Sequence, residues 1–244
     1  MSAVDARIQA AVRHFWSTRD TQISAQAARG ISDQGFRGSV TGGKQLDGFV
    51  NLVYEILLEE GIVDREIYYN RGVELPGYFR AEKQWDLLVV ADGALVAALE
   101  FKSQASSFGN NLNNRTEEAV GSATDLWTAY REKLIPLTPR PWIGYLALVA
   151  DCAESTTPVS VREPHFSVSP EFVKASYTKR YAILLEKLMR ESLYTSTCLI
   201  TTPEKSLEGA YAEPYTDLSF LHFETSLRSH VSAFQEIRSR RNSS

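Results

Sequence analysis

Apolar residues recur along this chain with two periods, and the alternation of those periods predicts a mixed α/β protein. Spacing by three and four residues, typical of amphipathic helices, covers residues 3–17, 46–60, 116–134, 171–193 and 217–237. Apolar or β-branched runs predict strands at 65–75, 139–151 and 195–203, and a strand hairpin at 85–104. This order predicts an α/β (α+β) fold, in which a mixed β-sheet with a central hairpin is flanked by helices on both faces.

Polar and glycine-rich segments separate the predicted elements. We expect a long connector over residues 18–43, an Asn-rich loop over 106–115 and a frayed tail after residue 237. Asn113 or Asn114 can cap the helix that follows the Asn-rich loop. The 244 residues are enough for a substantial core, and we expect them to form a single domain over residues 1–244.

Charged residues stand at the ends of the predicted hairpin. Side chains alternate across a strand, so Glu100, Lys102 and Gln104 share one face. A two-residue turn at 92–93 would pair position 86 with position 99 and direct Asp86 to the opposite face. Convergence of Asp86 with Glu100 therefore requires a three-residue loop or a β-bulge.

Such convergence would assemble a site for metal-assisted hydrolysis. Asp86 and Glu100 supply carboxylate oxygens, which Mg²⁺ prefers as ligands, and the carbonyl of Phe101 could add another. Lys102 could orient or deprotonate a water or stabilise negative charge, and Gln104 could position a water or a phosphate. The alternative is that these charges only face solvent at the end of a strand.

Composition and net charge disfavour only a few classes of protein. The net charge of −4 argues against a protein that coats nucleic acid, but not against a local basic cleft. Two distant cysteines, Cys152 and Cys198, indicate reduced thiols in the cytoplasm, and no apolar stretch suits a signal peptide or a membrane span. Scattered histidines and the lack of a GxxxxGK loop disfavour HNH, zincin and ATP-driven enzymes.

The D-x(n)-E-x-K spacing of the charged hairpin residues matches the short motif of PD-(D/E)xK nucleases. The hairpin, the helix after it and the next buried strand resemble the core of that superfamily. Trp85 stands where the motif usually has proline. Some of these nucleases carry a further acid on the preceding helix, and the resemblance makes Glu55 our candidate, with Asp47 behind it. A solvated helix face is the alternative for both acids.

Longer stretches resemble the XhoI-type restriction endonucleases. They are TGGKQLDGFVNLVYEIL, LPGYFRAEKQWDLLVV, ALEFKSQASSFGNNLNNRTEEAVGSATDLWTAYRE, PRPWIGYLALVAD and REPHFSVSPEFVKASYTKRYAILLEKL. Together they run from about residue 40 to residue 190, and the block from EFKSQ to GSATD is much more specific than the short motif. The resemblance implies a restriction-endonuclease-like domain with a catalytic core at about 44–150, and further helices with recognition and dimerisation elements at 151–244.

The same resemblance implies a type II restriction endonuclease. The implied reaction is Mg²⁺-dependent cleavage of double-stranded DNA, with Mn²⁺ as a possible substitute, within the palindrome 5′-CTCGAG-3′ to leave four-base 5′ overhangs. A palindromic site implies a homodimer in which each subunit cuts one strand. A companion DNA methyltransferase that protects host DNA is also implied.

Cationic and amide side chains that suit phosphate or base contacts flank the motif. They are Arg80, Lys83, Asn110, Asn111, Arg115, Arg162 and His165. Arg162 and His165, our candidates for reading guanines, lie in a proline-punctuated segment. A solvated surface loop is the alternative for that segment, and turn formation is the alternative for the asparagines.

Two other functions remain compatible with the sequence. A repair or recombination nuclease of the same fold would act on junctions or ends rather than on one defined site. A non-catalytic DNA-binding module would be expected to lose its charges, whereas Asp86, Glu100 and Lys102 are all present.

Overall fold

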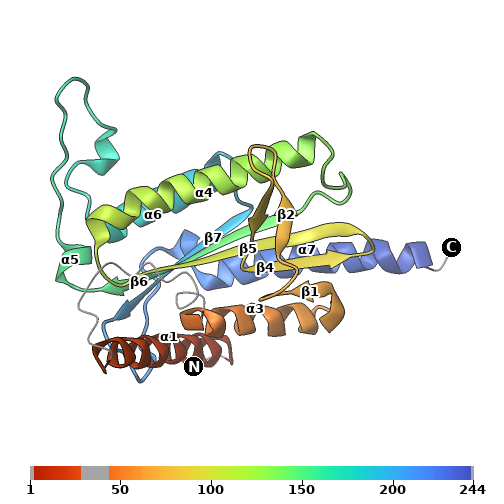
Figure 1. The fold of residues 1–244 in the computed structure, drawn as a ribbon, viewed down its shortest axis with the longest axis horizontal. Coiled ribbons are helices and arrows are strands. Elements are labelled where there is room, and N and C mark those ends of the chain that lie inside the picture. The colour runs from red at the N-terminus through yellow and green to blue at the C-terminus, as the bar shows by residue number, and fades with distance from the viewer. Residues whose placement is uncertain (1–2, 29–43, 243–244) are drawn as a thin grey trace.

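The computed structural model describes residues 3–28 and 44–242, and a five-stranded mixed sheet lies at its centre (Figure 1). The strands, in spatial order, are β1 (Ile67–Tyr68), β4 (Leu87–Ala91), β5 (Ala94–Gln104), β6 (Trp142–Asp151) and β7 (Ser196–Pro203). β1, β4 and β5 pair antiparallel, whereas β5, β6 and β7 run parallel. β5 therefore joins an antiparallel hairpin to a parallel half-sheet.

Helices cover both faces of this sheet. They are α1 (Ala3–Ala28), α3 (Asp47–Glu59), α4 (Phe108–Arg131), the short α5 (Ala153–Thr156), α6 (Tyr177–Arg190) and α7 (Phe220–Asn242). Single 3₁₀ turns lie in the connections at η1 (Asp64–Glu66), η2 (Pro170–Phe172) and η3 (Thr216–Leu218). α4 and α6 lie together on one face, and α1, α3 and α7 lie on the other (Figure 1). The predicted fold class is confirmed.

The parallel half of the sheet is buried on both faces because helices cover both. In β6 every residue from Trp142 to Ala150 is buried, so the prediction of a buried strand from this continuous apolar run is confirmed. Both cysteines, Cys152 and Cys198, are free thiols, as predicted. Among the described helices, none combines the length and the apolar character that a membrane crossing requires.

The hairpin of β4 and β5 combines a two-residue turn with a β-bulge. Ala91 pairs with Ala94 across the turn, but the register shifts so that Val89 pairs with Ala97 and Val96 has no partner on β4. This extra residue moves every pair beyond it by one position, so Leu87 lies opposite Leu99. Asp86 therefore lies across from Glu100, and the bulge required by the sequence argument is present.

The predicted strand at 65–75 is divided between two sheets. Its first residues form β1, and its last residues belong to β2 (Glu74–Pro76), which pairs antiparallel with β3 (Glu82–Gln84) in a separate two-stranded sheet. This small hairpin rises from the main sheet towards α4 (Figure 1). It places residues 77–81 beside that helix.

α4 begins two turns earlier than predicted. Phe108 and Leu112 are buried and extend the apolar stripe of the helix, and Phe108 stacks on Tyr177 with ring centroids 5.9 Å apart. The prediction of an Asn-rich loop is therefore wrong from Phe108 onward. Asn113 and Asn114 lie inside the helix and do not cap it.

The terminal helices are also longer than predicted. α1 continues to Ala28, into the expected connector, and residues 29–43 lie outside the described part of the chain. α7 continues to Asn242 instead of fraying after residue 237. Its last turns are held because Arg238 forms an ion pair with Glu66 at 2.6 Å.

The bulge carbonyl has a hydrogen-bond partner on α7. His230 Nε2 lies 3.1 Å from the carbonyl oxygen of Val96, and burial lowers the pKa of this imidazole. The neutral ring donates its N–H to the one β5 residue that the ladder leaves unpaired. We infer that His230 stabilises the bulge.

Replacement of His230 with Ala should therefore destabilise the fold. A buried carbonyl that loses its hydrogen-bond partner costs about 1–3 kcal/mol of unfolding free energy, which urea denaturation would measure. The exposed His165 offers a matched control, and His165→Ala should change stability by less than about 0.5 kcal/mol. Equal stabilities of the two variants would show that His230 does not support the bulge.

Candidate active site

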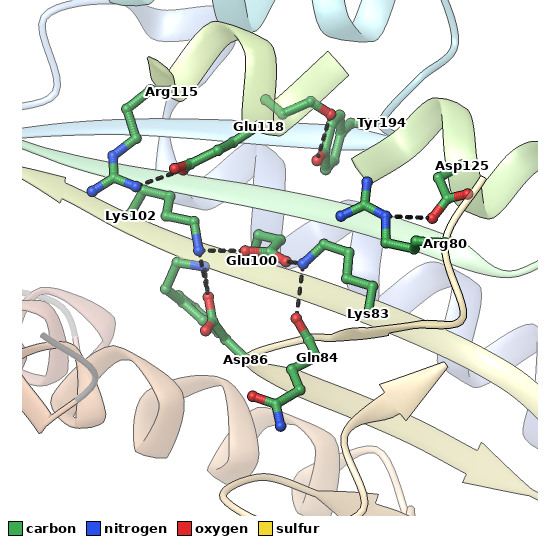
Figure 2. A network of polar contacts seen from close by, with 12 residues as sticks. Arg80, Lys83, Gln84, Asp86, Glu100, Lys102, Arg115, Glu118, Asp125 and Tyr194 are labelled. Carbon is green, nitrogen blue, oxygen red and sulfur yellow. Dashed lines mark hydrogen bonds and ion pairs between the residues drawn. The ribbon is translucent and has the colours of Figure 1, made fainter. Parts of the chain in front are cut away.

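Asp86, Glu100 and Lys102 converge at the open end of the hairpin (Figure 2). The Asp86 carboxylate accepts the backbone N–H of Phe101 at 2.7 Å, which fixes its orientation across the strand pair. The Lys102 ammonium lies 2.5 Å from Glu100 Oε2 and 3.5 Å from Asp86 Oδ2. The structure thus brings together the motif residues that the sequence predicted.

Glu100 is 3% exposed, and both of its oxygens are engaged by lysines. Lys102 pairs with one oxygen, and Lys83 of β3 pairs with the other. Burial alone would raise the pKa of Glu100, but the two ammonium groups outweigh it and lower the pKa. Glu100 is therefore a carboxylate at neutral pH.

The Asp86 side chain is 37% exposed, so it is less buried than Glu100, but its carboxyl lies among Glu100, Lys102 and the Phe101 N–H and loses much of its hydration there. Desolvation of its carboxyl, followed by repulsion from Glu100, raises the pKa of Asp86 to about 6. Lys102 and the Phe101 N–H oppose that shift without cancelling it. Asp86 is thus the member of the pair that titrates nearest to neutral pH.

Lys102 is held in its charged form. Burial would lower the pKa of its ammonium, but Glu100 and then Asp86 outweigh burial and raise the pKa above its ordinary value. A protonated amine cannot accept a proton from water. Of the roles considered for Lys102, this raised pKa favours stabilisation of negative charge over deprotonation of a water.

A pocket of about 270 Å³ adjoins Glu100 and Lys102, between the sheet and α4. Arg80, Lys83 and Arg115, three of the predicted DNA contacts, line it together with Glu100 and Lys102. Arg115 pairs with Glu118 of α4 at 2.6 Å, and Arg80 pairs with Asp125 of α4 at 2.8 Å. Figure 2 shows these pairs on either side of Glu100.

Tyr145 and Tyr194 also line this pocket, and sequence reasoning missed both. Their rings meet edge to face with centroids 5.4 Å apart. The Tyr145 hydroxyl is buried without a hydrogen-bond partner among the described residues, and burial raises its pKa well above the ordinary value. Tyr145 pairs with Glu100 in the parallel register of β5 and β6, so a correct register would have pointed to it.

Two of the predicted catalytic residues, Gln104 and Glu55, have surroundings that differ from those of Asp86, Glu100 and Lys102. Gln104 shares the face of Glu100 but is buried, and its amide donates to the Ser106 carbonyl and accepts from the Tyr181 hydroxyl. These bonds hold the amide inside the fold, and a contact of Gln104 with water or phosphate stays a prediction. Glu55 is exposed on α3 and lies 3.8 Å from Arg7, which matches the solvated helix face considered for it.

The remaining candidates are spread over the surface. Asn111 lies in the first turns of α4, and the side chain of Asn110 lies outside the described part. Arg162 and His165 are exposed in the irregular segment between α5 and α6, and α6 begins at Tyr177, after the Ser176 cap, instead of at 171. Their predicted role in base recognition remains a prediction.

The Asp86→Asn variant should be more stable than the wild type, and the difference in unfolding free energy should increase as the pH rises. The folded state holds the Asp86 proton more tightly than the unfolded state does, because the pKa rises from 3.8 to about 6. The stability that this proton confers is therefore present below pH 3.8 and is lost as the pH rises through about 6. Asn cannot ionise and keeps an oxygen for the Phe101 N–H.

Urea denaturation in EDTA from about pH 4 to pH 8 would measure this difference. The advantage of Asp86→Asn over the wild type should grow through about pH 6 and then level off. An advantage that stays constant across the range would mean that Asp86 has an ordinary pKa.

Comparison with known proteins assigns a family to this arrangement. The model of the restriction endonuclease XhoI family matches residues 25–213. The type II restriction enzyme BstVI of Geobacillus stearothermophilus is 50% identical over 206 residues, which are 82% of this chain and 92% of that protein. The type II restriction enzyme XhoI of Xanthomonas vasicola is 41% identical over 86% of this chain and 85% of its own length. No solved structure matches. The chain belongs to the XhoI family of type II restriction endonucleases.

Proposed function

We propose that this protein hydrolyses phosphodiester bonds of DNA with the help of a divalent cation held by Asp86 and Glu100. The observation that carries the proposal is the placement of these two carboxylates opposite each other across the bulged hairpin, with the Lys102 ammonium near both. Membership in a restriction endonuclease family makes DNA the substrate.

The donor set fits a hard divalent cation. Asp86 and Glu100 offer two carboxylates, and the Phe101 carbonyl is the third protein oxygen that we propose. Within residues 3–28 and 44–242 no group of three His, Cys, Asp or Glu side chains gathers to hold a metal. Mg²⁺ suits such a sparse set because it commonly keeps several waters and a substrate phosphate as ligands, and we propose that Mn²⁺ can substitute. When bound, the cation would lower the pKa of a water and neutralise charge on the phosphate.

The protein residues have separate tasks in this proposal. Lys102 stays protonated and stabilises the negative charge that develops on the phosphate oxygens. Glu100 orients the Lys102 ammonium through their 2.5 Å contact. Lys83, Arg80 and Arg115 line the adjoining pocket and contribute positive charge for the DNA backbone.

The recognition site and assembly follow from the family as proposals. We infer cleavage within 5′-CTCGAG-3′ to leave four-base 5′ overhangs. A palindrome is matched by a homodimer whose two-fold axis coincides with that of the DNA, so that each subunit cuts one strand. A DNA methyltransferase that modifies the same sequence would protect the host.

Digestion of a plasmid of known sequence tests this proposal. We expect one defined set of cuts in the presence of Mg²⁺ and none in EDTA, and mapping of the ends should place the cuts within CTCGAG. Cleavage only at junctions, flaps or free ends would identify a structure-specific nuclease instead. Absence of cleavage together with retained DNA binding would identify a non-catalytic module.

Isosteric variants test the roles of the charged residues. Asp86→Asn, Glu100→Gln and Lys102→Met should each lower the cleavage rate by about 10²-fold or more, because each removes charge from the reacting centre. Glu117→Gln, at an exposed position on α4, is the matched control and should cleave as the wild type does. Circular dichroism would establish that each variant is folded. Cleavage at the wild-type rate by any of the three would remove that residue from the site.

A further inference from the structure

We propose that the tip of the β2–β3 hairpin, Tyr78 and Phe79, is a rigid aromatic contact with DNA bases next to the cleaved phosphate. This inference rests on the proposed nuclease function and adds a base-contacting element to it. Tyr78 is 51% exposed and Phe79 is 70% exposed. Their rings lie edge to face with centroids 4.9 Å apart. The two rings lie next to each other instead of being scattered singly, and contiguous exposed apolar side chains are a feature of binding surfaces.

A buried carboxylate holds the backbone of this tip. Asp125 of α4 is 2% exposed, and its Oδ1 accepts the N–H groups of Tyr78 and Phe79, each at 2.8 Å. Its other oxygen, Oδ2, lies 2.8 Å from Arg80 Nε. Because one carboxylate binds three consecutive residues, the tip has a defined conformation that does not depend on burial of its rings.

Gly77 shows how closely the tip is fitted to α4. A Cβ atom at this position would lie 2.6 Å from the Arg80 carbonyl oxygen and 2.7 Å from Asp125 Oδ2. These distances are far below van der Waals contact, so only glycine allows the loop to approach the carboxylate. The anchoring uses the backbone and Arg80, which leaves both aromatic rings available for another surface.

The same hairpin reaches into the candidate active site. Lys83 of β3 pairs with Glu100, and Arg80, next to Phe79, lines the pocket that Glu100 and Lys102 also line. Because Arg80 is the chain neighbour of Phe79 and also lines that pocket, the tip lies beside the place where we propose that the DNA backbone binds.

The chemistry of the tip favours DNA over a second copy of the chain as its partner. Arg80 directly follows the aromatic pair, and Lys83 lies on the next strand, so cations that suit phosphates flank rings that suit bases. Aromatic side chains stack on bases regardless of sequence, and apolar side chains can also enter between base pairs and unstack them. Arg80 and Lys83 also line the pocket beside Glu100 and Lys102, so the rings adjoin the place where we propose that the DNA phosphate binds.

The test uses a duplex that contains the mapped cleavage site, with Ca²⁺ as the metal probe, since Ca²⁺ also binds carboxylate oxygens. Phe79→Ala and Tyr78→Ala should each weaken binding about tenfold or more, as loss of base stacking does. With 2-aminopurine in or next to the site, wild-type protein should raise its fluorescence by unstacking it, and Phe79→Ala should not. Leu221→Ala, which removes an exposed apolar side chain from α7, is the matched control.

Gly77→Ala tests whether DNA binding depends on the position of the two rings and not only on their presence. It retains both rings but displaces the tip from Asp125, so it should also weaken binding, while urea denaturation shows whether the domain remains folded. Unchanged affinity and unchanged 2-aminopurine fluorescence in Phe79→Ala would overturn the proposal. So would a wild-type dimer that Phe79→Ala converts to monomers in sedimentation experiments, since the tip would then be a contact between copies.

Failure of this inference can be told apart from failure of the proposed function. If the wild type cuts the plasmid at one defined site and Phe79→Ala cuts it equally well, only the role of the tip is wrong. If the wild type neither binds nor cuts DNA, the nuclease proposal itself is wrong.

Discussion

Burial of a carboxylate inside a sheet is costly unless opposite charges compensate for the lost water, and Glu100 depends on two lysines for that compensation. Lys102 comes from the same strand, whereas Lys83 comes from the separate β2–β3 sheet. The ion pair between Lys83 and Glu100 therefore links the small sheet to the main one. Arg80 and Asp125 link the same hairpin to α4. Glu100 therefore lies among the main sheet, the β2–β3 hairpin and α4, and its charge helps to hold the hairpin in place.

Each cation around this site is paired with an acid, some on another element and some on the same element, so a cluster of cations at the site is compatible with the net negative charge of the chain. Arg80 pairs with Asp125, Arg115 with Glu118, and both lysines with Glu100 (Figure 2). Paired cations keep a fixed geometry before any substrate arrives. A site of this kind presents positive charge at a few positions and needs no excess of Lys and Arg over the whole surface.

Much of the fold and the centre of the site followed from the sequence. Strict alternation on β5 placed Glu100 and Lys102 on one face, and the continuous apolar run of β6 predicted a buried strand. Placing Asp86 on the face of Glu100 requires a loop of odd length or a bulge, but strand alternation does not locate the bulge. That position depends on long-range contacts such as the one between His230 and the Val96 carbonyl, which local periodicity does not report.

The errors share this origin in tertiary contacts. The Asn-rich segment looked like a loop, but burial of Phe108 and Leu112 makes it helical. The role of Gln104 stays a prediction, but its contact with Tyr181 of α6 is likewise a tertiary contact that strand alternation does not report. Tyr145 was missed because a single hydroxyl inside an apolar run has no sequence signature until the strand register is known.

The β-bulge at Val96 also limits how the hairpin between Asp86 and Glu100 can change in length. Between Asp86 and Glu100, the gain or loss of a single residue would rotate one carboxylate to the far side of the sheet. A change of two residues preserves the facing of both side chains. Insertions and deletions in this hairpin should therefore be tolerated in pairs, or singly when a second bulge appears or the present one is lost. This limit on length adds to the limits at the turn itself, where Asp92 and Gly93 both have positive φ and Asp92 pairs with Arg238 at 3.0 Å.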